Sequence, residues 1–287
     1  MITGAHGQLG RELIRRGGEH TLLAIDHDQL DICDVNAVRD ASDAFRPDVI
    51  INAAAYTAVD RAESDQDQAH AVNYNGSKNL ALVAESADIP LIHVSTDYVY
   101  DGSKHGAYIE NDPVAPLGVY GTSKLAGEKA IQECASKWIV LRTSWVFSAH
   151  GNNFVKTMLR LGADRETLGV VADQYGCPTS ANELARAIYA MLDTGLNDDI
   201  WGVYHFCQPK SATWFEFANS IFSEAVKQGV ELKVSNVNAI ATSDYPTVAQ
   251  RPKNSVLDCN KFEHAFSFKI RPWSESLHDV IKELKHD

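Results

Sequence analysis

Four short apolar runs rich in β-branched residues alternate with helix-like segments through the first half of the chain. Continuous apolar runs of this length are typical of parallel strands buried on both faces. Between them, apolar residues recur three and four apart, which indicates crossover helices packed on a sheet. We therefore predict an α/β fold, a Rossmann-type doubly wound parallel sheet. The expected strands are residues 21–26, 48–55, 90–96 and 138–147, and the expected helices are residues 7–16, 68–87 and 120–136.

Beyond residue 150 the alternation is less regular. We expect helices over residues 152–162, 181–192 and 213–226, with strands near residues 168–172 and 202–206. This change of pattern predicts a smaller C-terminal substrate lobe. We assign residues 1–150 to the dinucleotide-binding domain, with some segments of 168–210 returning to it. Residues 211–287 and parts of 151–180 are assigned to the substrate lobe.

Composition narrows the classes of partner and of site that the chain can have. The net charge of -12 disfavours nucleic acid or an anionic membrane as a partner, since both need clustered cations. No run reaches the roughly 18 apolar residues of a membrane-spanning helix. An odd number of dispersed cysteines without a C-x-x-C pair argues against a disulfide framework or a structural zinc site. We expect a cytoplasmic protein that acts on a small molecule. The cysteines are Cys33, Cys134, Cys177, Cys207 and Cys259.

The segment GAHGQLG has the spacing of a phosphate-binding turn. Gly4 permits a tight turn, Gly7 lets backbone N–H groups approach a pyrophosphate, and Gly10 allows close packing of helix on strand. An ordinary glycine-rich loop is the alternative. Only Met1, Ile2 and Thr3 precede the turn, although a central strand usually spans about five residues. We therefore expect the natural start to lie a few residues upstream.

Acidic residues follow the second expected strand. Asp26 ends it about 16 residues after Gly10, near the offset at which a carboxylate binds the adenosine ribose. It would repel a 2′-phosphate and so favours NADH, although it could simply end the strand. Asp31 and Ile32 could line an adenine pocket, although Asp31 could equally be a solvated loop acid.

Three residues form a candidate catalytic group. Tyr120 and Lys124 lie four apart, hence on one face of the expected helix. A nearby ammonium favours the phenolate, so Lys124 should make Tyr120 a better proton donor to a developing alkoxide. Thr96 ends the fourth expected strand, where its hydroxyl can stabilise negative charge on a substrate carbonyl. The alternative for Thr96 is a strand-end residue bonded to backbone.

Six segments in chain order carry a family resemblance. They resemble extended short-chain dehydrogenase/reductases of the dTDP-4-dehydrorhamnose reductase type, and the similarity runs from Gly4 to the RPKNS segment near residue 254. STDYVYDG and RTSWVF with the downstream QYGCPTS are its most specific parts, because the whole superfamily shares the glycine spacing. The six segments are the glycine turn, NAAAYTAVDRAES, STDYVYDG, YGTSKLAGE, RTSWVF and GNNFVKTMLRL.

The resemblance implies an oxidoreductase that transfers hydride from NADPH or NADH to the 4-keto group of dTDP-4-dehydro-L-rhamnose, giving dTDP-L-rhamnose. It makes Tyr120 the proton donor, Lys124 a ligand of the nicotinamide ribose and Thr96 the hydroxyl that polarises the carbonyl. Asp97 and Trp145 resemble residues that contact the nucleotide sugar, and Arg251 could bind its diphosphate. The alternatives are that Trp145 is only a core residue and that Arg251 forms a surface ion pair. The implied cofactor residues are Gly7, Gln8 and Leu9 at the pyrophosphate and Ala54, Ala55 and Thr57 beside them.

Some members of this family are dimers with a magnesium ion held by interfacial glutamates. Glu12 and Glu183 resemble two of those positions, without an identifiable third, and Glu12 also suits the first turn of a helix. We therefore expect a homodimer with Mg²⁺ only from the resemblance. Two rival functions are a 4-ketoreductase for another nucleotide-deoxysugar and a non-catalytic regulatory subunit like that of methionine adenosyltransferase. The complete catalytic group favours an enzyme.

Overall fold

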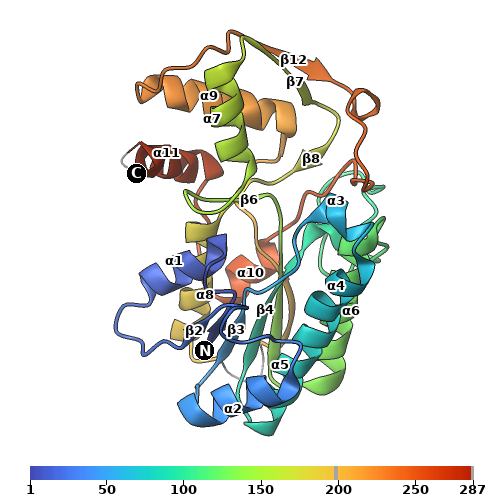
Figure 1. The fold of residues 1–287 in the computed structure, drawn as a ribbon, viewed down its shortest axis with the longest axis vertical. Coiled ribbons are helices and arrows are strands. Elements are labelled where there is room, and N and C mark those ends of the chain that lie inside the picture. Colours follow the sequence, from blue (N-terminus) through green and yellow to red (C-terminus); the bar gives the residue numbers. More distant parts are fainter. Residues whose placement is uncertain (197–199, 286–287) are drawn as a thin grey trace.

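A six-stranded sheet forms the centre of the larger lobe in the computed structural model, which describes residues 1–196 and 200–285 (Figure 1). Its order is β10-β5-β4-β3-β1-β2, and every pair of neighbours is parallel. The order reverses between β1 and β3, the place where doubly wound sheets bind ligands. The strands are β1 Ile2–Thr3, β2 Ala24–Ile25, β3 Ile50–Asn52, β4 Leu91–Thr96, β5 Trp138–Thr143 and β10 Gly202–His205.

Helices cover both faces of this sheet, as the predicted fold class requires. On one face, α1 and α8 lie side by side over a core that includes Leu13 and Ile92. On the other, α2, α5 and α6 cover Leu80 and Leu91. The helices are α1 Gln8–Arg16, α2 Val35–Phe45, α3 Val59–Ala62, α4 Gln66–His70, α5 Ser77–Ser86, α6 Val119–Cys134 and α8 Ala181–Asp193. The helix expected over residues 68–87 is thus α4 and α5, joined by the π-helical segment η1 Ala71–Gly76.

The sequence analysis missed α2. Asp34 caps it by accepting hydrogen bonds from the N–H groups of Asn36 and Ala37 at 2.9 and 3.2 Å. An aspartate ahead of a helical segment is a recognisable start signal. This helix completes the connection between β2 and β3.

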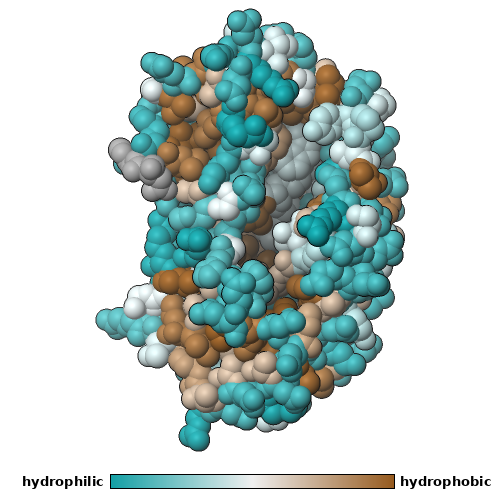
Figure 2. Space-filling model, viewed as in Figure 1, coloured by the Kyte–Doolittle hydropathy of each residue, from teal (hydrophilic) through white to brown (hydrophobic). Residues whose placement is uncertain are grey.

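The smaller lobe has its own core and lies above the sheet in Figure 1. There β7 pairs in parallel with β12, while α7 packs against α9 and α9 against α11. Figure 2 shows a hollow in the face of the molecule where the two lobes meet. The elements are β6 Val146–Phe147, α7 Phe154–Asp164, β7 Thr167–Val171, β8 Tyr175–Gly176, β9 Thr179–Ser180, β11 Ala212–Thr213, α9 Trp214–Lys227, β12 Asn236–Ile240, the 3-10 turn η3 Thr242–Asp244, and α11 Trp273–Leu284.

One segment departs from the predicted lobe boundaries. The helix α10, Asn260–Ala265, and the residues that follow it to Ile270 pack with the large sheet rather than with the C-terminal lobe. Phe262 and Phe266 contact Tyr204 of β10 through their rings. The reason is that these aromatic side chains cover the edge strand β10. Within the described part of the chain, no helix is both long and apolar enough to cross a bilayer.

The short first strand sits in the middle of the sheet. Ile2 and Thr3 pair with β2 on one side and β3 on the other. The amino group of Met1 donates to the carbonyl oxygen of Val49 at 2.8 Å, which continues the contact with the β3 side. Because burial disfavours its charge, the pKa of this amino group falls to about 6.

Candidate active site

The glycine turn connects β1 to α1 in a geometry that only glycine accommodates. Gly4 has a φ of +76°, and a Cβ there would lie 2.6 Å from the nitrogen of Ala54. A Cβ on Gly10 would lie 2.1 Å from the carbonyl oxygen of Gly4. The helix begins at Gln8 after Gly7, with no side-chain cap from the described residues. Its first N–H groups are therefore available to an anion, and the turn fits a pyrophosphate.

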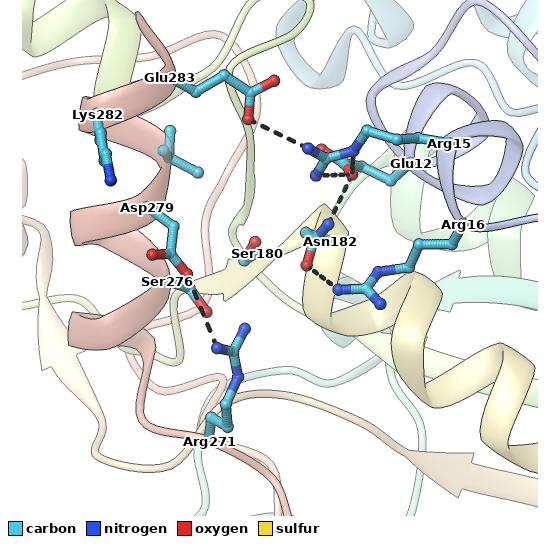
Figure 3. Close-up of a pocket in the computed structure, with 11 residues that line it drawn as sticks. Glu12, Arg15, Arg16, Ser180, Asn182, Arg271, Ser276, Asp279, Lys282 and Glu283 are labelled. Atoms are coloured by element: carbon cyan, nitrogen blue, oxygen red, sulfur yellow. Dashed lines mark hydrogen bonds and ion pairs between the residues drawn. The ribbon is translucent and has the colours of Figure 1, made fainter.

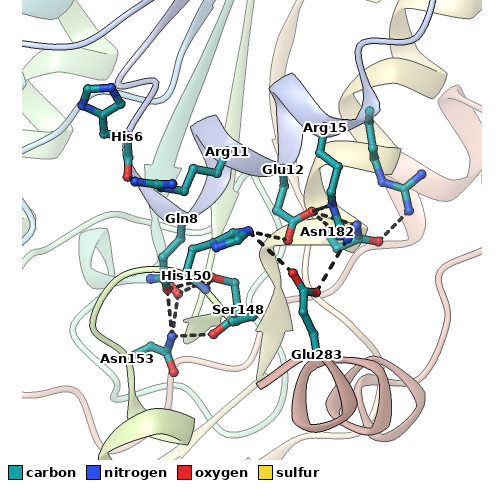
Figure 4. Close-up of polar contacts among 12 residues, drawn as sticks. His6, Gln8, Arg11, Glu12, Arg15, Ser148, His150, Asn153, Asn182 and Glu283 are labelled. Carbon is teal, nitrogen blue, oxygen red and sulfur yellow. Dashed lines mark hydrogen bonds and ion pairs between the residues drawn. The ribbon is translucent and has the colours of Figure 1, made fainter. Parts of the chain in front are cut away.

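Two residues of this turn have separate roles. The side-chain amide oxygen of Gln8, Oε1, accepts hydrogen bonds from Ser148 Oγ at 3.1 Å and from Asn153 Nδ2 at 3.0 Å (Figure 4). These bonds fasten the turn to the loop between β6 and α7. The side chain of Leu9 is buried in the core, so only its backbone can face a cofactor.

Asp26 lies beside the turn at the end of β2. Its carboxylate accepts from the backbone N–H of His6 at 2.6 Å and of His27 at 2.7 Å. Burial raises the pKa of Asp26, but these hydrogen bonds outweigh burial and the net pKa is lowered. Asp31 is exposed and accepts from the N–H of Cys33 at 2.9 Å, as a loop acid would.

The remaining predicted cofactor residues differ in burial. Ile32 is buried against Gly76, and a Cβ added to Gly76 would come within 2.5 Å of the Cδ1 atom of Ile32. Ala54 and Ala55 are half-buried after β3, close to Gly4, whereas Thr57 is exposed.

Thr96, Asp97 and Tyr120 come together at the carboxyl end of β4. The Thr96 hydroxyl donates to Asp97 Oδ1 at 3.1 Å and accepts from the N–H of Tyr98 at 3.2 Å. Asp97 Oδ2 is buried and has no hydrogen-bond partner among residues 1–196 and 200–285. Burial raises the pKa of Asp97 to about 6. Burial also raises the pKa of the partly exposed Tyr120 to about 12, against a lowering by Thr96.

Lys124 is one helical turn from Tyr120 but is bonded to the sheet. Its Nζ donates to the carbonyl oxygen of Val94 at 2.7 Å and lies 3.2 Å from His93 Nε2. Burial lowers the pKa of Lys124 to about 8. Lys124 is not among the groups that shift the pKa of Tyr120 in this structure, and burial of the phenol sets the net direction. Tyr120 therefore holds its proton at neutral pH.

The two other residues predicted to contact the substrate, Trp145 and Arg251, both have partners within the chain. Trp145 has a φ of +47° and stacks on Trp214 with ring centroids 3.4 Å apart. A left-handed tryptophan is strained, and such strain concentrates at functional sites. Arg251 forms a two-pronged ion pair with Asp60 at 2.8 and 3.3 Å, so the ion-pair alternative describes this structure.

The glutamates considered for magnesium do not fit a metal site within one chain. Glu12 accepts from Arg15 and from Asn182 beside a cavity of about 630 Å³ between α1, α8 and α11 (Figure 3). Glu183 is fully buried and bonded to both Arg186 and Arg271. Among the described residues, no group of three His, Cys, Asp or Glu side chains is placed to hold a metal ion. This cavity also lies away from Tyr120, which lines a different pocket.

The sequence analysis missed several side chains of the site. His93 and Asn52 are polar residues inside apolar strand runs, and that interruption was the available signal. Trp214 and Asp60 gave no comparable signal, because only the fold brings them to Trp145 and Arg251.

Comparison with known proteins decides the family. The model of the RmlD substrate binding domain matches residues 1–286. A dTDP-4-dehydrorhamnose reductase from Aggregatibacter actinomycetemcomitans is 46% identical, over 98% of this chain and 97% of its own. The chain belongs to the dTDP-4-dehydrorhamnose reductase family.

Two solved structures agree with this assignment. A dTDP-4-dehydrorhamnose reductase from Clostridium acetobutylicum is 38% identical, has a TM-score of 0.92, and the match covers 99% of this chain and 98% of that one. Its counterpart from Bacillus anthracis in complex with NADP is 38% identical, with a TM-score of 0.90 and 98% coverage of both chains. Membership confirms the predicted Rossmann-type fold and identifies this protein as an oxidoreductase with a nicotinamide cofactor.

Proposed function

We propose that the protein reduces the 4-keto group of dTDP-4-dehydro-L-rhamnose and releases dTDP-L-rhamnose. The observation that carries this proposal is the meeting of Thr96, Asp97 and Tyr120 at the carboxyl end of β4, within a chain of this family. The nicotinamide, when bound, supplies the hydride that reaches C4. The rest of the chemistry belongs to side chains of this chain.

Proton donation falls to Tyr120. Its pKa near 12 keeps the phenol protonated, so it can give its proton to O4 as negative charge develops there. The Thr96 hydroxyl, which donates to Asp97 in this structure, turns to donate to the same oxygen. Asp97 Oδ2 then accepts from a sugar hydroxyl, which satisfies a buried carboxylate oxygen.

The nucleotide part of the substrate lies toward the smaller lobe in this proposal. Trp145, supported from behind by Trp214, gives a flat apolar wall for it. Arg251 binds the diphosphate by leaving or sharing Asp60, since a guanidinium has donors for both.

Either nicotinamide cofactor fits the proposal. Gly7, Gln8 and the Leu9 backbone bind the pyrophosphate, and Asp26 beside them favours the ribose of NADH. A relative of the same family binds NADP, and the exposed side chains of Arg11 and His27 near the turn give a 2′-phosphate a partner. We also propose a homodimer, without assigning magnesium a part in the reaction.

The direct test is oxidation of NADPH and NADH by the purified protein with dTDP-4-dehydrorhamnose. We expect turnover with both cofactors, and a loss of about 10²- to 10⁴-fold in Tyr120→Phe. Cofactor affinity in this variant stays close to wild type. The control is Tyr189→Phe, which removes a half-buried hydroxyl on α8 that donates to the carbonyl oxygen of Leu13 on α1, and leaves turnover intact.

The rival functions predict other results. Turnover only with a different 4-keto nucleotide sugar would indicate a related ketoreductase. Tight association with a partner protein, with no sugar-dependent oxidation of either cofactor, would indicate a regulatory subunit and end the reductase proposal.

A further inference from the structure

A row of buried polar side chains crosses the sheet beneath the catalytic helix. Thr3, Asn52 and His93 occupy paired positions on β1, β3 and β4. All three are nearly inaccessible, and they bond in sequence: Thr3 Oγ1 to Asn52 Oδ1 at 2.8 Å, and Asn52 Nδ2 to His93 Nδ1 at 2.9 Å. At the end of the row, His93 Nε2 lies 3.2 Å from the Nζ of Lys124.

A backbone group fixes the direction of these hydrogen bonds. The N–H of Ala54 donates to Asn52 Oδ1 at 3.0 Å. A backbone N–H can only donate, so this atom of Asn52 must be the carbonyl oxygen, and its NH₂ faces His93. His93 Nδ1 therefore accepts. Because burial keeps the pKa of His93 well below its usual range, the ring is neutral and carries its proton on Nε2.

The consequence falls on Lys124. An ammonium has three donors and no acceptor, so a His93 Nε2–H directed at Nζ bonds well only to the neutral amine. The amine keeps one N–H for the carbonyl oxygen of Val94, at 2.7 Å, and has a second to offer. The ammonium would instead turn one of its own N–H groups toward the Nε2–H of His93, and this contact between two donors disfavours the charged form.

The other charged groups near Lys124 act mainly on other side chains. Glu128, one turn further along α6, favours the ammonium, but it is bonded by the Arg142 guanidinium of β5 at 2.7 to 3.2 Å. Asp97, at the end of β4, acts on Tyr120. Only His93 presents a proton to Nζ in the described part of the chain.

We propose that His93 is a positioning residue of the reductase proposed above: it directs its Nε2–H at Lys124 Nζ and so favours the amine over the ammonium. A lysine with an ordinary proton affinity would stay charged throughout turnover. Thr3 and Asn52, the other members of the row, hold the histidine in the required tautomer.

The test is the pH profile of kcat/KM with NADPH and dTDP-4-dehydrorhamnose. Because the pKa of Lys124, about 8, lies below the pKa of Tyr120, about 12, we expect the alkaline limb to report Lys124 with a midpoint near pH 8 in wild type. Removing the donor in His93→Leu should raise the midpoint by about one pH unit, roughly tenfold in the acid constant. In His93→Gln an amide N–H still faces Lys124 Nζ, so we expect the midpoint of the alkaline limb to stay at its wild-type pH.

A second variant keeps the histidine and reverses the row. Asn52→Asp presents an acceptor to Nδ1, moves the ring proton there, and should raise the midpoint at least as far. Val140→Ala, a packing change beside His93 on β5, should leave it in place. An unmoved midpoint in a folded His93→Leu overturns the proposal, and if that variant does not fold, an unmoved midpoint in Asn52→Asp overturns it.

A readout without turnover separates this proposal from the proposed function. The ¹³Cε chemical shift of Lys124 in ¹³C-lysine-labelled protein reports the same titration directly. A shifted NMR midpoint in His93→Leu supports the role of His93 even if the wild type fails to reduce the sugar. An unshifted NMR midpoint overturns it even if the sugar is reduced.

Discussion

Two buried histidines lie on the strands that flank β5, and their surroundings differ. His205 on β10 contacts the carbonyl oxygen of Tyr108 through Nδ1 at 3.1 Å and the hydroxyl of Tyr100 through Nε2 at 2.8 Å. A carbonyl only accepts, so the His205 proton is on Nδ1. His93 on β4 carries its proton on the opposite nitrogen and directs it at Lys124.

The difference separates a structural cluster from a functional one. The His205 cluster continues through Tyr100 to the ion pair of Arg142 with Glu128, and its hydrogen bonds end within the core. The His93 row ends on a titratable side chain at the ligand-binding edge. A buried polar network thus stabilises one part of the sheet and tunes chemistry in another, according to what its last member is.

The largest expected effect is on the structural cluster. Arg142→Met leaves Glu128 charged and unpaired in the core, so we expect a loss of about 3–5 kcal/mol in the free energy of unfolding. Lys124→Met, the matched change at the other cluster, removes a charge that burial disfavours but also takes the Lys124 donor from the buried carbonyl oxygen of Val94, so we expect a smaller net loss of about 1–2 kcal/mol. Urea denaturation of both variants and of the wild type measures these losses in the free energy of unfolding. Equal losses would remove the distinction between the clusters.

His205 should also make stability fall in acid. Burial lowers its pKa from 6.5 to about 3, so the unfolded chain binds the extra proton as pH falls through this window. The wild type should lose about 2–3 kcal/mol from this group between pH 7 and 4.5. His205→Gln should lack that part of the pH dependence, whereas the exposed His105→Gln should keep it. Parallel curves for all three proteins would contradict the assignment.

Asp97 should show a smaller effect of opposite sign. Its pKa is raised to about 6, so the folded state binds more protons than the unfolded chain between about pH 4 and 6, and stability falls as pH rises there. Asp97→Asn should therefore raise the free energy of unfolding by about 1–2 kcal/mol at pH 7, while it lowers kcat/KM. The gain should vanish below about pH 4. A destabilised Asp97→Asn at pH 7 would show that its hydrogen bonds outweigh burial.

The smallest effect concerns β1, which carries the far end of the His93 row. The Met1 amino group is buried with a pKa of about 6, against 8.0 when exposed, so its charge disfavours folding below pH 8. Two apolar residues added ahead of Met1 should stabilise the fold by about 1 kcal/mol at pH 7 and strengthen cofactor binding. Thermal melts at pH 7 and 9 test this, since the part due to charge should disappear at pH 9.

Much of the fold was readable because apolar periodicity reports burial directly. The runs at residues 90–96 and 138–147 became β4 and β5 with β6, and the helices at 120–136 and 181–192 became α6 and α8. The misplaced segment was residues 260–270. Its aromatic residues are suited to any core, so the sequence could not tell which lobe they would join.

The sequence by itself determined the α/β class, the glycine turn and the order of the family motifs along the chain. These features depend only on the spacing of residues that are close in sequence. Only the tertiary structure decided which charges matter. It bonded Lys124 to His93, paired Arg251 with Asp60 and, among the residues that the structure describes, left one oxygen of Asp97 without a partner. Such contacts join residues distant in sequence, and burial, which sets their proton affinities, exists only once the chain has folded.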